Sequence, residues 1–286
     1  MTETIRFKDG AAYERYMGRW SQLAGRTFLD WLQPPTGRRW LDIGCGNGAF
    51  TELIVERTAP AAVTGIDPSP EQLTFARRQA PLRQAEFHEG DAMALPFADA
   101  AFDVAVMPLV IFFVPEPPRG VAEMVRVVAP GGLVSAYAWD MPGGGFPYHA
   151  LFTAIRESGM TVPETPHPDV SRMDELRTLW TSAGLTEIAT HEITVERRYA
   201  GFDEYWEVVL GGASVGGKLR ALSAADRTAL QARLRAMLPI APDGSITYTA
   251  RANAVRGRVP PRASGPARPT GPRRHFDIEP ASPEGP

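Results

Sequence analysis

Residues 39–140 alternate short apolar runs with longer amphipathic stretches, and this alternation limits the possible folds more than any other feature of the chain. Each run has the length of a buried strand, and each stretch that follows has helical spacing. Repeated units of strand, turn and helix build a parallel sheet with helices on both faces. The predicted strands are 39–43, 62–66, 85–88, 102–107 and 133–139, and the predicted helices are 48–58, 70–80 and 116–128.

Further elements are predicted on both sides of this region. Downstream, the pattern predicts helices at 173–183, 202–210 and 223–238 and a strand at 187–196. The segment 246–255 alternates apolar and polar residues, which is typical of a strand with one buried face, and we expect it to be antiparallel. Upstream, aromatic and aliphatic residues at helical spacing over 12–31 predict a helical cap across the sheet. The expected fold class is therefore α/β, with a mostly parallel sheet and an N-terminal helical cap.

Composition excludes several other classes of protein. The 286 residues carry 30 Lys+Arg against 33 Asp+Glu, and 44% are hydrophobic, which excludes a mostly disordered chain and disfavours a general nucleic-acid binder. Cys45 has no second cysteine with which to form a disulfide. The sequence starts without an apolar secretion signal, and the longest apolar run, 104–115, is too short to cross a bilayer. We expect a cytoplasmic protein without a membrane partner.

A glycine-rich segment, Asp42-Ile43-Gly44-Cys45-Gly46-Asn47-Gly48, lies between the first predicted strand and its helix. Glycines lack a Cβ, so a ligand can approach the backbone, and free N–H groups at the start of the helix favour an anionic ligand group near Gly46 to Gly48. The same residues also satisfy a dinucleotide fingerprint, read as Gly44-x-Gly46-x-x-Ala49. This loop alone therefore leaves the ligand open.

Acidic residues follow the next two predicted strands. Asp67 ends the second strand, where a carboxylate can accept both hydroxyl protons of a ribose. Asp91, in Gly90-Asp91-Ala92, follows the third strand and could accept a hydrogen bond from the exocyclic amine of adenine. Open α/β sheets bind ligands at the carboxyl ends of their parallel strands, so the three loops together indicate an adenosine site.

These motifs resemble the class I S-adenosylmethionine-dependent methyltransferases, in the small-molecule branch whose compact domain is called methyltransferase type 11. The resemblance covers about residues 40–140 and includes Glu123, Arg126 and the turn Pro130-Gly131-Gly132. It implies a Rossmann-like sheet of seven strands with the last one antiparallel, and S-adenosylmethionine as cofactor. It also implies that Asp42 helps to orient the methionyl amino group, which favours this family over a dinucleotide enzyme.

The resemblance and the loop positions together suggest two sets of binding residues. Those expected to contact the cofactor are Tyr16, Asp42, Gly44, Cys45, Gly46, Gly48, Asp67, Pro68, Asp91, Ala92 and Met107. Those expected to form the acceptor pocket are Tyr13, Trp20, Leu109, Phe112, Trp139, Phe146 and Trp206. As a set, the second group suggests an apolar or planar acceptor of modest size.

Methyl transfer from a sulfonium needs mainly the alignment of a nucleophile in a dry pocket. A general base is required only where the nucleophile must lose a proton. Asp140, Tyr148 and His149 follow the fifth strand and are weak candidates for that base, and His167 lies further on. We expect a small-molecule partner, no nucleic-acid partner and no metal site, while the acceptor atom (O, N or C) and the oligomeric state stay open.

Two other functions stay open on the sequence. An NAD-dependent oxidoreductase would use the same glycine loop, and a catalytically silent module would bind the nucleotide without turnover. The predicted organisation is a helical cap (1–38), an S-adenosylmethionine-binding core (39–140), and substrate-side insertions with the C-terminal strands of the same domain (141–256). The segment 257–286 is rich in proline, glycine and arginine without an apolar period, and we expect it to be a disordered tail.

Overall fold

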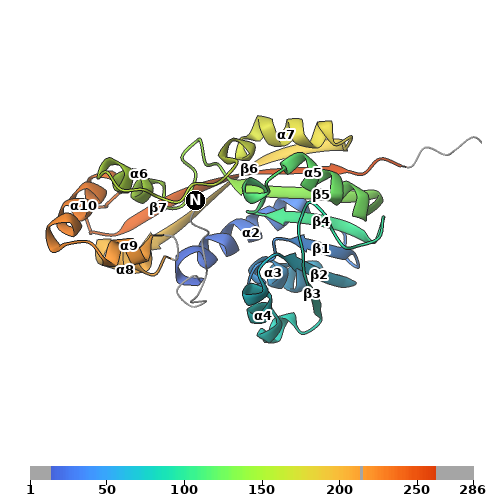
Figure 1. Cartoon of the computed structure of the whole chain (residues 1–286), viewed down its shortest axis with the longest axis horizontal. Helices are drawn as coiled ribbons and strands as arrows, with labels where there is room; N and C mark the ends of the chain where they lie inside the picture. Colours follow the sequence, from blue (N-terminus) through green and yellow to red (C-terminus); the bar gives the residue numbers. More distant parts are fainter. Residues whose placement is uncertain (1–13, 213–214, 262–286) are drawn as a thin grey trace, which may run out of the picture.

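A seven-stranded sheet forms the centre of the molecule, in a computed structural model that describes residues 14–212 and 215–261 (Figure 1). The strand order is β3-β2-β1-β4-β5-β7-β6. Neighbouring strands from β1 to β5 pair in parallel, and β7 runs antiparallel to both β5 and β6. The predicted fold class, with an antiparallel last strand, is confirmed. The strands are β1 (Arg39–Ile43), β2 (Ala62–Asp67), β3 (Ala85–Glu89), β4 (Phe102–Pro108), β5 (Val128–Trp139), β6 (Thr186–Tyr199) and β7 (Ile246–Arg258).

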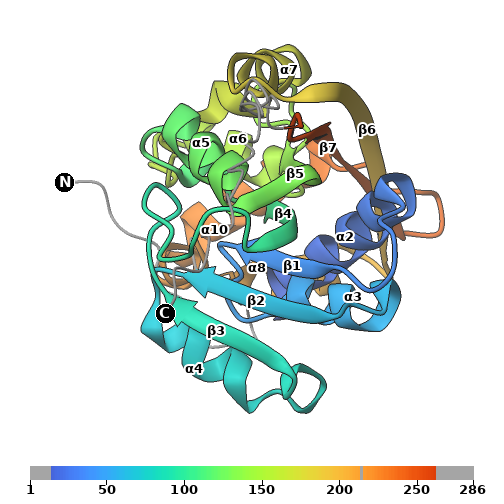
Figure 2. The same ribbon diagram turned by 90° about the vertical axis from the view of Figure 1, so that its right-hand side faces the viewer.

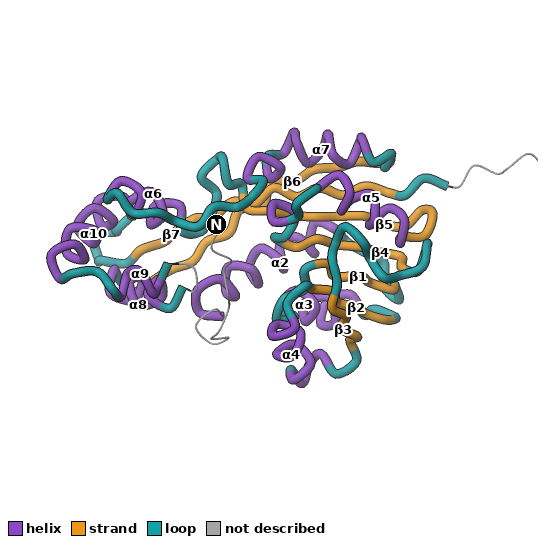
Figure 3. The backbone as a smooth tube through the Cα atoms, in the orientation of Figure 1, coloured by secondary structure: helices purple, strands orange, loops and turns teal. Residues whose placement is uncertain are grey.

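Helices cover both faces of this sheet. In Figures 1 and 3, α2, α3 and α4 lie on one side, and α5 and α7 lie on the other. The α-helices are α2 (Arg19–Leu32), α3 (Ala49–Thr58), α4 (Pro70–Arg78), α5 (Pro117–Val127), α6 (His149–Glu157), α7 (Met173–Ser182), α8 (Phe202–Leu210), α9 (Gly216–Arg220) and α10 (Ala224–Met237). Shorter helical turns are η1 (Glu14–Gly18), η2 (Ala80–Leu82), η3 (Ile111–Phe113) and η4 (Pro168–Ser171).

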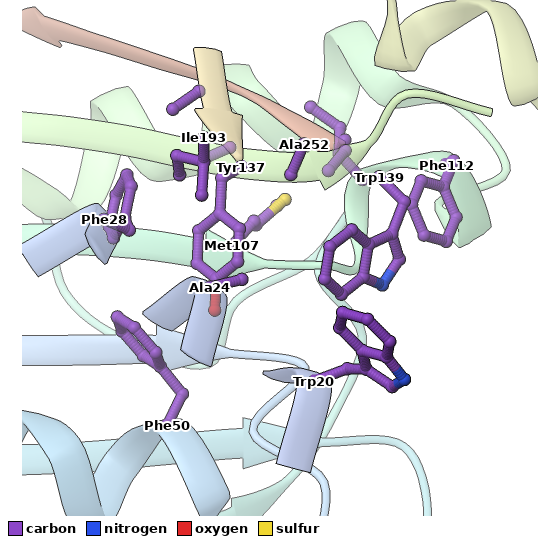
Figure 4. Close-up of a cluster of buried hydrophobic side chains, with 14 of the residues drawn as sticks. Trp20, Ala24, Phe28, Phe50, Met107, Phe112, Tyr137, Trp139, Ile193 and Ala252 are labelled. Carbon is purple, nitrogen blue, oxygen red and sulfur yellow. The ribbon is translucent and has the colours of Figure 1, made fainter. Parts of the chain in front are cut away.

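Helix α2 crosses the sheet, as predicted for the cap. Its Phe28 ring lies 4.6 Å from the Tyr137 ring of β5, and its Trp31 stacks on His191 of β6 at 5.4 Å. The Phe50 ring of α3 completes this contact, 6.0 Å from Phe28 (Figure 4). Aromatic rings bury a large apolar area per residue, so these contacts fix the cap on the sheet.

Strands β6 and β7 extend well past the rest of the sheet. Residues 252–258 of β7 pair with β5, whereas residues 246–251 pair with β6 alone. At roughly 3.4 Å per residue, this ribbon reaches about 20 Å beyond the end of β5. Helices α6, α8, α9 and α10 gather along it and form what we call the helical lobe, which lies behind the sheet in Figure 2.

The structure also differs from the predicted elements. β7 continues to Arg258, two residues into the predicted tail, because those residues pair with β5. β5 begins directly after α5, before the turn that was expected to separate them. Helices α6 and α9 were not predicted, since both are short and α6 follows Pro147. Tyr13 and residues 262–286 lie outside the described residues, and the predictions for them stay untested.

The described helices also bear on the membrane prediction. Across residues 14–212 and 215–261, no helix combines the length and the apolar character that crossing a membrane requires.

Candidate functional site

The loop between β1 and α3 turns on glycines in the left-handed conformation. Gly44, Gly46 and Gly48 have φ angles of +72°, +53° and +87°, which other residues adopt only at a cost in free energy. A Cβ at Gly44 would lie 2.4 Å from a methyl carbon of Val110, whereas a Cβ at Gly46 would meet no atom within 4 Å. Gly44 is therefore required for packing, and Gly46 borders open space where a ligand can reach the backbone.

Asp42 lies one residue before the end of β1 and is fully buried, with 0% of its surface exposed. Its Oδ2 accepts a hydrogen bond from Thr51 Oγ1 of α3 at 2.7 Å, while its Oδ1 has no partner among the described residues. Burial raises the pKa of Asp42 to about 7, the Thr51 hydrogen bond opposes this rise, and nearby Asp67 adds to it. A buried oxygen without a donor is unfavourable, so it marks a place for a donating or cationic ligand group.

Asp67, at the end of β2, closes the glycine loop. Its Oδ2 accepts from the Gly46 amide and its Oδ1 from the Ser69 amide, both at 2.9 Å. Each carboxylate oxygen keeps capacity for a second hydrogen bond, so ligand hydroxyls can still be bound. The start of α4 does not depend on Asp67, because the Ser69 hydroxyl accepts from the Gln72 amide and caps the helix.

Asp91 follows β3 on a loop that is hydrogen-bonded to Asp67. The Gly90 amide donates to the Asp67 carbonyl at 3.2 Å. Asp91 is exposed, and its Oδ1 accepts from the Met93 amide at 2.8 Å. The three predicted loops therefore meet at the carboxyl edge of the sheet, on either side of Asp67.

An ion pair on α5 holds the loop that follows Asp91. Arg126 pairs with Glu123 at 2.7 Å and donates to the carbonyls of Leu95 and Phe97 at 2.8 and 2.7 Å. Glu123 in turn accepts from the Leu95 amide at 2.8 Å. Hydrogen bonds from Arg126 lower the pKa of the Glu123 carboxyl. This pair, part of the family resemblance, thus anchors the loop rather than facing the open space at Gly46.

The amides of the glycine loop are largely used inside the protein. Gly46 donates to Asp67, Gly48 to the Cys45 carbonyl at 2.9 Å, and Ala49 to Asn47 Oδ1 at 3.2 Å. The prediction that free amides here favour an anionic group is therefore wrong for these three, because folding of the loop engages them. A pyrophosphate relies on such amides, so the geometry disfavours the dinucleotide alternative.

The other predicted cofactor residues differ in their surroundings. Cys45 is buried, and burial raises the pKa of its thiol, so it stays protonated. Met107 is buried with its methyl group near Gly120 of α5, Pro68 is exposed and Ala92 is half-buried. Within residues 14–212 and 215–261, no group of three or more His, Cys, Asp or Glu side chains is placed to hold a metal ion.

Two of the candidate bases are engaged in structural contacts. Asp140 Oδ2 accepts from Arg251 at 2.6 Å, which ties the turn after β5 to β7. The Tyr148 hydroxyl donates to the Tyr16 carbonyl at 2.6 Å, and the two rings stack with centroids 4.1 Å apart. Burial raises the pKa of Tyr148 well above 10. His149 is exposed at the start of α6.

The predicted acceptor residues that the structure describes belong to one buried apolar cluster: Trp20, Phe112, Trp139 and Trp206 are members of it, and Leu109 and Phe146 pack against it. Trp20, Phe112 and Trp139 share a buried cluster beside β4 and β5 (Figure 4). Trp139 Nε1 has no hydrogen-bond partner among the described residues. The Phe146 ring, which packs against this cluster, lies 6.0 Å from the Tyr148 ring. Trp206 belongs to α8 in the helical lobe, where it stacks on its neighbour Phe202 at 6.1 Å.

The loop after β4 joins the acceptor side to the glycine loop. Leu109 has a φ of +61°, unusual for a residue with a side chain, and its amide donates to the Tyr137 carbonyl at 2.7 Å. Val110 then packs on Gly44. Backbone strain of this kind is found at functional sites. Val110 and Thr51 were missed by sequence reasoning, since neither stands in a motif and only their packing links them to the site.

The strand order reverses between β1 and β4, and the glycine loop lies at that point, as in a Rossmann-like domain with the sheet of class I methyltransferases. Residues 41–136 match the family model described as "Methyltransferase domain". The resemblance to methyltransferases predicted from the sequence is thereby confirmed for this part of the chain.

Individual relatives are similar over the same region. The chain is 37% identical over 103 residues to phthiotriol/phenolphthiotriol dimycocerosates methyltransferase from Mycobacterium leprae, covering 36% of this chain and 38% of that protein. It is 36% identical over 120 residues to demethylmenaquinone methyltransferase from Deinococcus radiodurans, covering 41% and 48%. The matched region thus spans less than half of each relative.

A solved structure is similar over most of the chain. Phosphoethanolamine N-methyltransferase 2 from Haemonchus contortus, in complex with S-adenosyl-L-methionine, superposes with a TM-score of 0.56 at 17% identity. The match covers 88% of this chain and 56% of that one. At this identity the likeness shows a shared fold.

Proposed function

We propose that the protein is an enzyme that transfers a methyl group from S-adenosylmethionine to a small apolar or planar acceptor, at O, N or C. One observation carries the proposal: Asp42 is fully buried, and its Oδ1 has no partner among the described residues. It belongs to the same glycine-rich segment as Gly46, which borders open space. The methionyl ammonium group would supply the missing donor to Asp42. Asp67 would hold the ribose hydroxyls and Asp91 the adenine. This matches the order of the loops along the edge of the sheet, from β1 through β2 to β3.

When bound, S-adenosylmethionine supplies an electrophilic methyl group on a sulfonium. The chain must then bind the cofactor, exclude water and align the acceptor. The buried cluster of Trp20, Phe112 and Trp139 supports a dry, apolar acceptor side. Of the three candidate bases, His149 has the most available side chain, because those of Asp140 and Tyr148 are engaged elsewhere.

The relatives support the same choice of acceptor. One is named for demethylmenaquinone and another for phthiotriol and phenolphthiotriol dimycocerosates, and these names are consistent with an apolar acceptor here. We further propose a cytoplasmic location, on the single cysteine and the composition, and a small-molecule partner, on the names of the relatives.

A ligand panel tests the cofactor first. Melting temperature is measured with S-adenosylmethionine, S-adenosylhomocysteine and NAD⁺, for the wild type and for Asp67→Ala. We expect the first two ligands to stabilise the wild type and Asp67→Ala to lose that effect. Stabilisation by NAD⁺ instead would establish the oxidoreductase alternative.

Turnover is tested next. Small-molecule extracts are incubated with the enzyme and a methyl-labelled donor, and products that gain the label are identified by mass spectrometry. We expect a labelled product that is absent with Asp67→Ala. Cofactor binding without transfer to any acceptor would favour the catalytically silent module.

A further inference from the structure

Thr51 and Asp42 form a hydrogen-bonded pair beneath the glycine loop. Both residues are 0% exposed, and Thr51 lies in the first turn of α3. Asp42 pairs with Gly65 of β2 on one side and Val106 of β4 on the other, neither of which carries a polar side chain. Of the described side chains, Thr51 alone donates to Asp42, and it reaches only Oδ2. The pair therefore leaves one carboxylate oxygen to be satisfied from outside.

The charges around Asp42 favour its neutral form while no ligand is bound. From β2 it faces the Asp67 carboxylate, and from the loop it faces the buried Cys45 thiol. None of the described ion pairs includes Asp42, and Arg77 of α4 is directed to the Phe87 carbonyl at 2.7 Å. An ionised Asp42 would thus be a buried anion with a second anion nearby and no described cation in contact.

We propose that binding of the cofactor's ammonium group expels the proton of Asp42, and that Thr51 is the positioning residue that directs Oδ1 toward the cofactor. The inference rests on the proposed function. The carboxyl O–H bond breaks, the proton passes to solvent, and the resulting carboxylate pairs with the ammonium. Each molecule in which Asp42 is protonated therefore releases one proton when the cofactor binds. The Thr51 hydroxyl donates to Oδ2 throughout and so leaves Oδ1 for the cofactor.

Titration calorimetry measures this proton directly. S-adenosylmethionine and S-adenosylhomocysteine are titrated at pH 6 and pH 7 in buffers of different ionisation enthalpy, and the dependence of the binding heat on the buffer gives the protons released. With a free pKa of about 7 for Asp42, we expect release of about half a proton at pH 7 and about 0.9 at pH 6, with affinity about fivefold weaker at pH 6. The ligand amino group, whose ordinary pKa is about 7.7–8.0, contributes little at these pH values.

Variants separate Asp42 from other titrating groups. Asp42→Asn keeps the shape of the side chain and its contact with Thr51 but has no proton to lose, so we expect release near zero and little change in affinity between pH 6 and pH 7. Thr51→Val removes the hydrogen bond that favours the ionised form, so release at pH 7 should rise above that of the wild type. Thr51→Ser should restore the wild-type value.

The possible outcomes are distinct. Cofactor binding with no proton release, or release that persists in Asp42→Asn, overturns this inference and leaves the proposed function intact. Absence of binding by either ligand at both pH values overturns the proposed function and the inference with it. If Thr51→Val fails to fold, as judged by circular dichroism, the proton counts of the wild type and Asp42→Asn still decide the role of Asp42, and Thr51→Ser against Thr51→Ala then tests the positioning residue.

Discussion

Gly46→Ala should separate cofactor binding from folding, because the protein leaves room for the new methyl group, whereas a cofactor bound as proposed would contact it. The Cβ would meet no atom within 4 Å. The backbone there has a φ of +53°, so the substitution should lower the free energy of unfolding only by the cost of a left-handed alanine, about 1–2 kcal/mol. Methyl contact with the cofactor should weaken binding by tenfold or more, which corresponds to at least about 1.4 kcal/mol.

Two other glycines calibrate this substitution. Gly37 has a φ of +68° and open space at its Cβ, but lies in the turn before β1, away from the site. Gly37→Ala should therefore show the conformational cost alone. Gly44→Ala adds a clash with Val110 at 2.4 Å, and overpacking of about 1–3 kcal/mol should bring its total loss of stability to about 2–5 kcal/mol.

The assay combines urea unfolding of the three variants with calorimetric titration of S-adenosylmethionine. We expect Gly46→Ala and Gly37→Ala to lose similar stability, and only Gly46→Ala to lose affinity. If Gly46→Ala binds the cofactor as tightly as Gly37→Ala does, the ligand does not approach the loop at Gly46 and the placement proposed above is refuted.

Other substitutions test the supporting contacts. Arg126→Ala should lower the free energy of unfolding by about 2–3 kcal/mol and weaken cofactor binding, because it frees the loop after Asp91. As a control, Arg172→Ala removes an exposed ion pair and should lower the free energy of unfolding by less than about 1 kcal/mol. Chemical denaturation measures the stability of both variants, and calorimetry measures their cofactor binding. Tyr148→Phe should cost about 1–2 kcal/mol and leave the pH profile of methyl transfer unchanged, since its hydroxyl serves a backbone carbonyl; a changed profile would instead place Tyr148 in proton transfer. The pKa of Asp42 is raised in the folded state, so its contribution to stability is present below about pH 4 and lost as pH rises toward 7. Denaturation at pH 5 and pH 8 should show that the stability of Asp42→Asn, relative to the wild type, is higher at pH 8. A difference in stability that is the same at both pH values would contradict the raised pKa.

The sheet was predictable because each of its parallel strands is marked locally. The runs that become β1, β2 and β4 are short, apolar and followed by turn residues, as buried parallel strands are. The capping signature at Ser69 fixed the start of α4 within one residue. Because parallel strands present their carboxyl ends at one edge, placing Asp67 and Asp91 in the sequence also placed them together in space.

The helical lobe and the acceptor side were less predictable, since they depend on contacts between distant segments. β6 alternates clearly between buried and exposed residues only over its second half, most of which pairs with residues 246–251 of β7, beyond the end of β5. Trp206 was grouped with Trp139 on residue type alone. Both belong to one buried cluster, but Trp206 joins it from α8 in the helical lobe, where it stacks on Phe202. Aromatic composition predicts burial but not the partner that provides it.

The chemistry of Asp42 shows a different limit. Its motif specifies that a carboxylate stands near the end of β1, and that much follows from the sequence. The selection of a cationic ligand group that we propose for Asp42 depends on what surrounds it: a donor from Thr51 on one oxygen, an acid at Asp67, and no described donor on the other oxygen. An unmet hydrogen bond in a buried place is a property of packing. The same unmet hydrogen bond would make this loop bind an ammonium group in preference to a phosphate. A phosphate is disfavoured because its charge has the same sign as that of the acidic residues, and because the loop amides are already engaged.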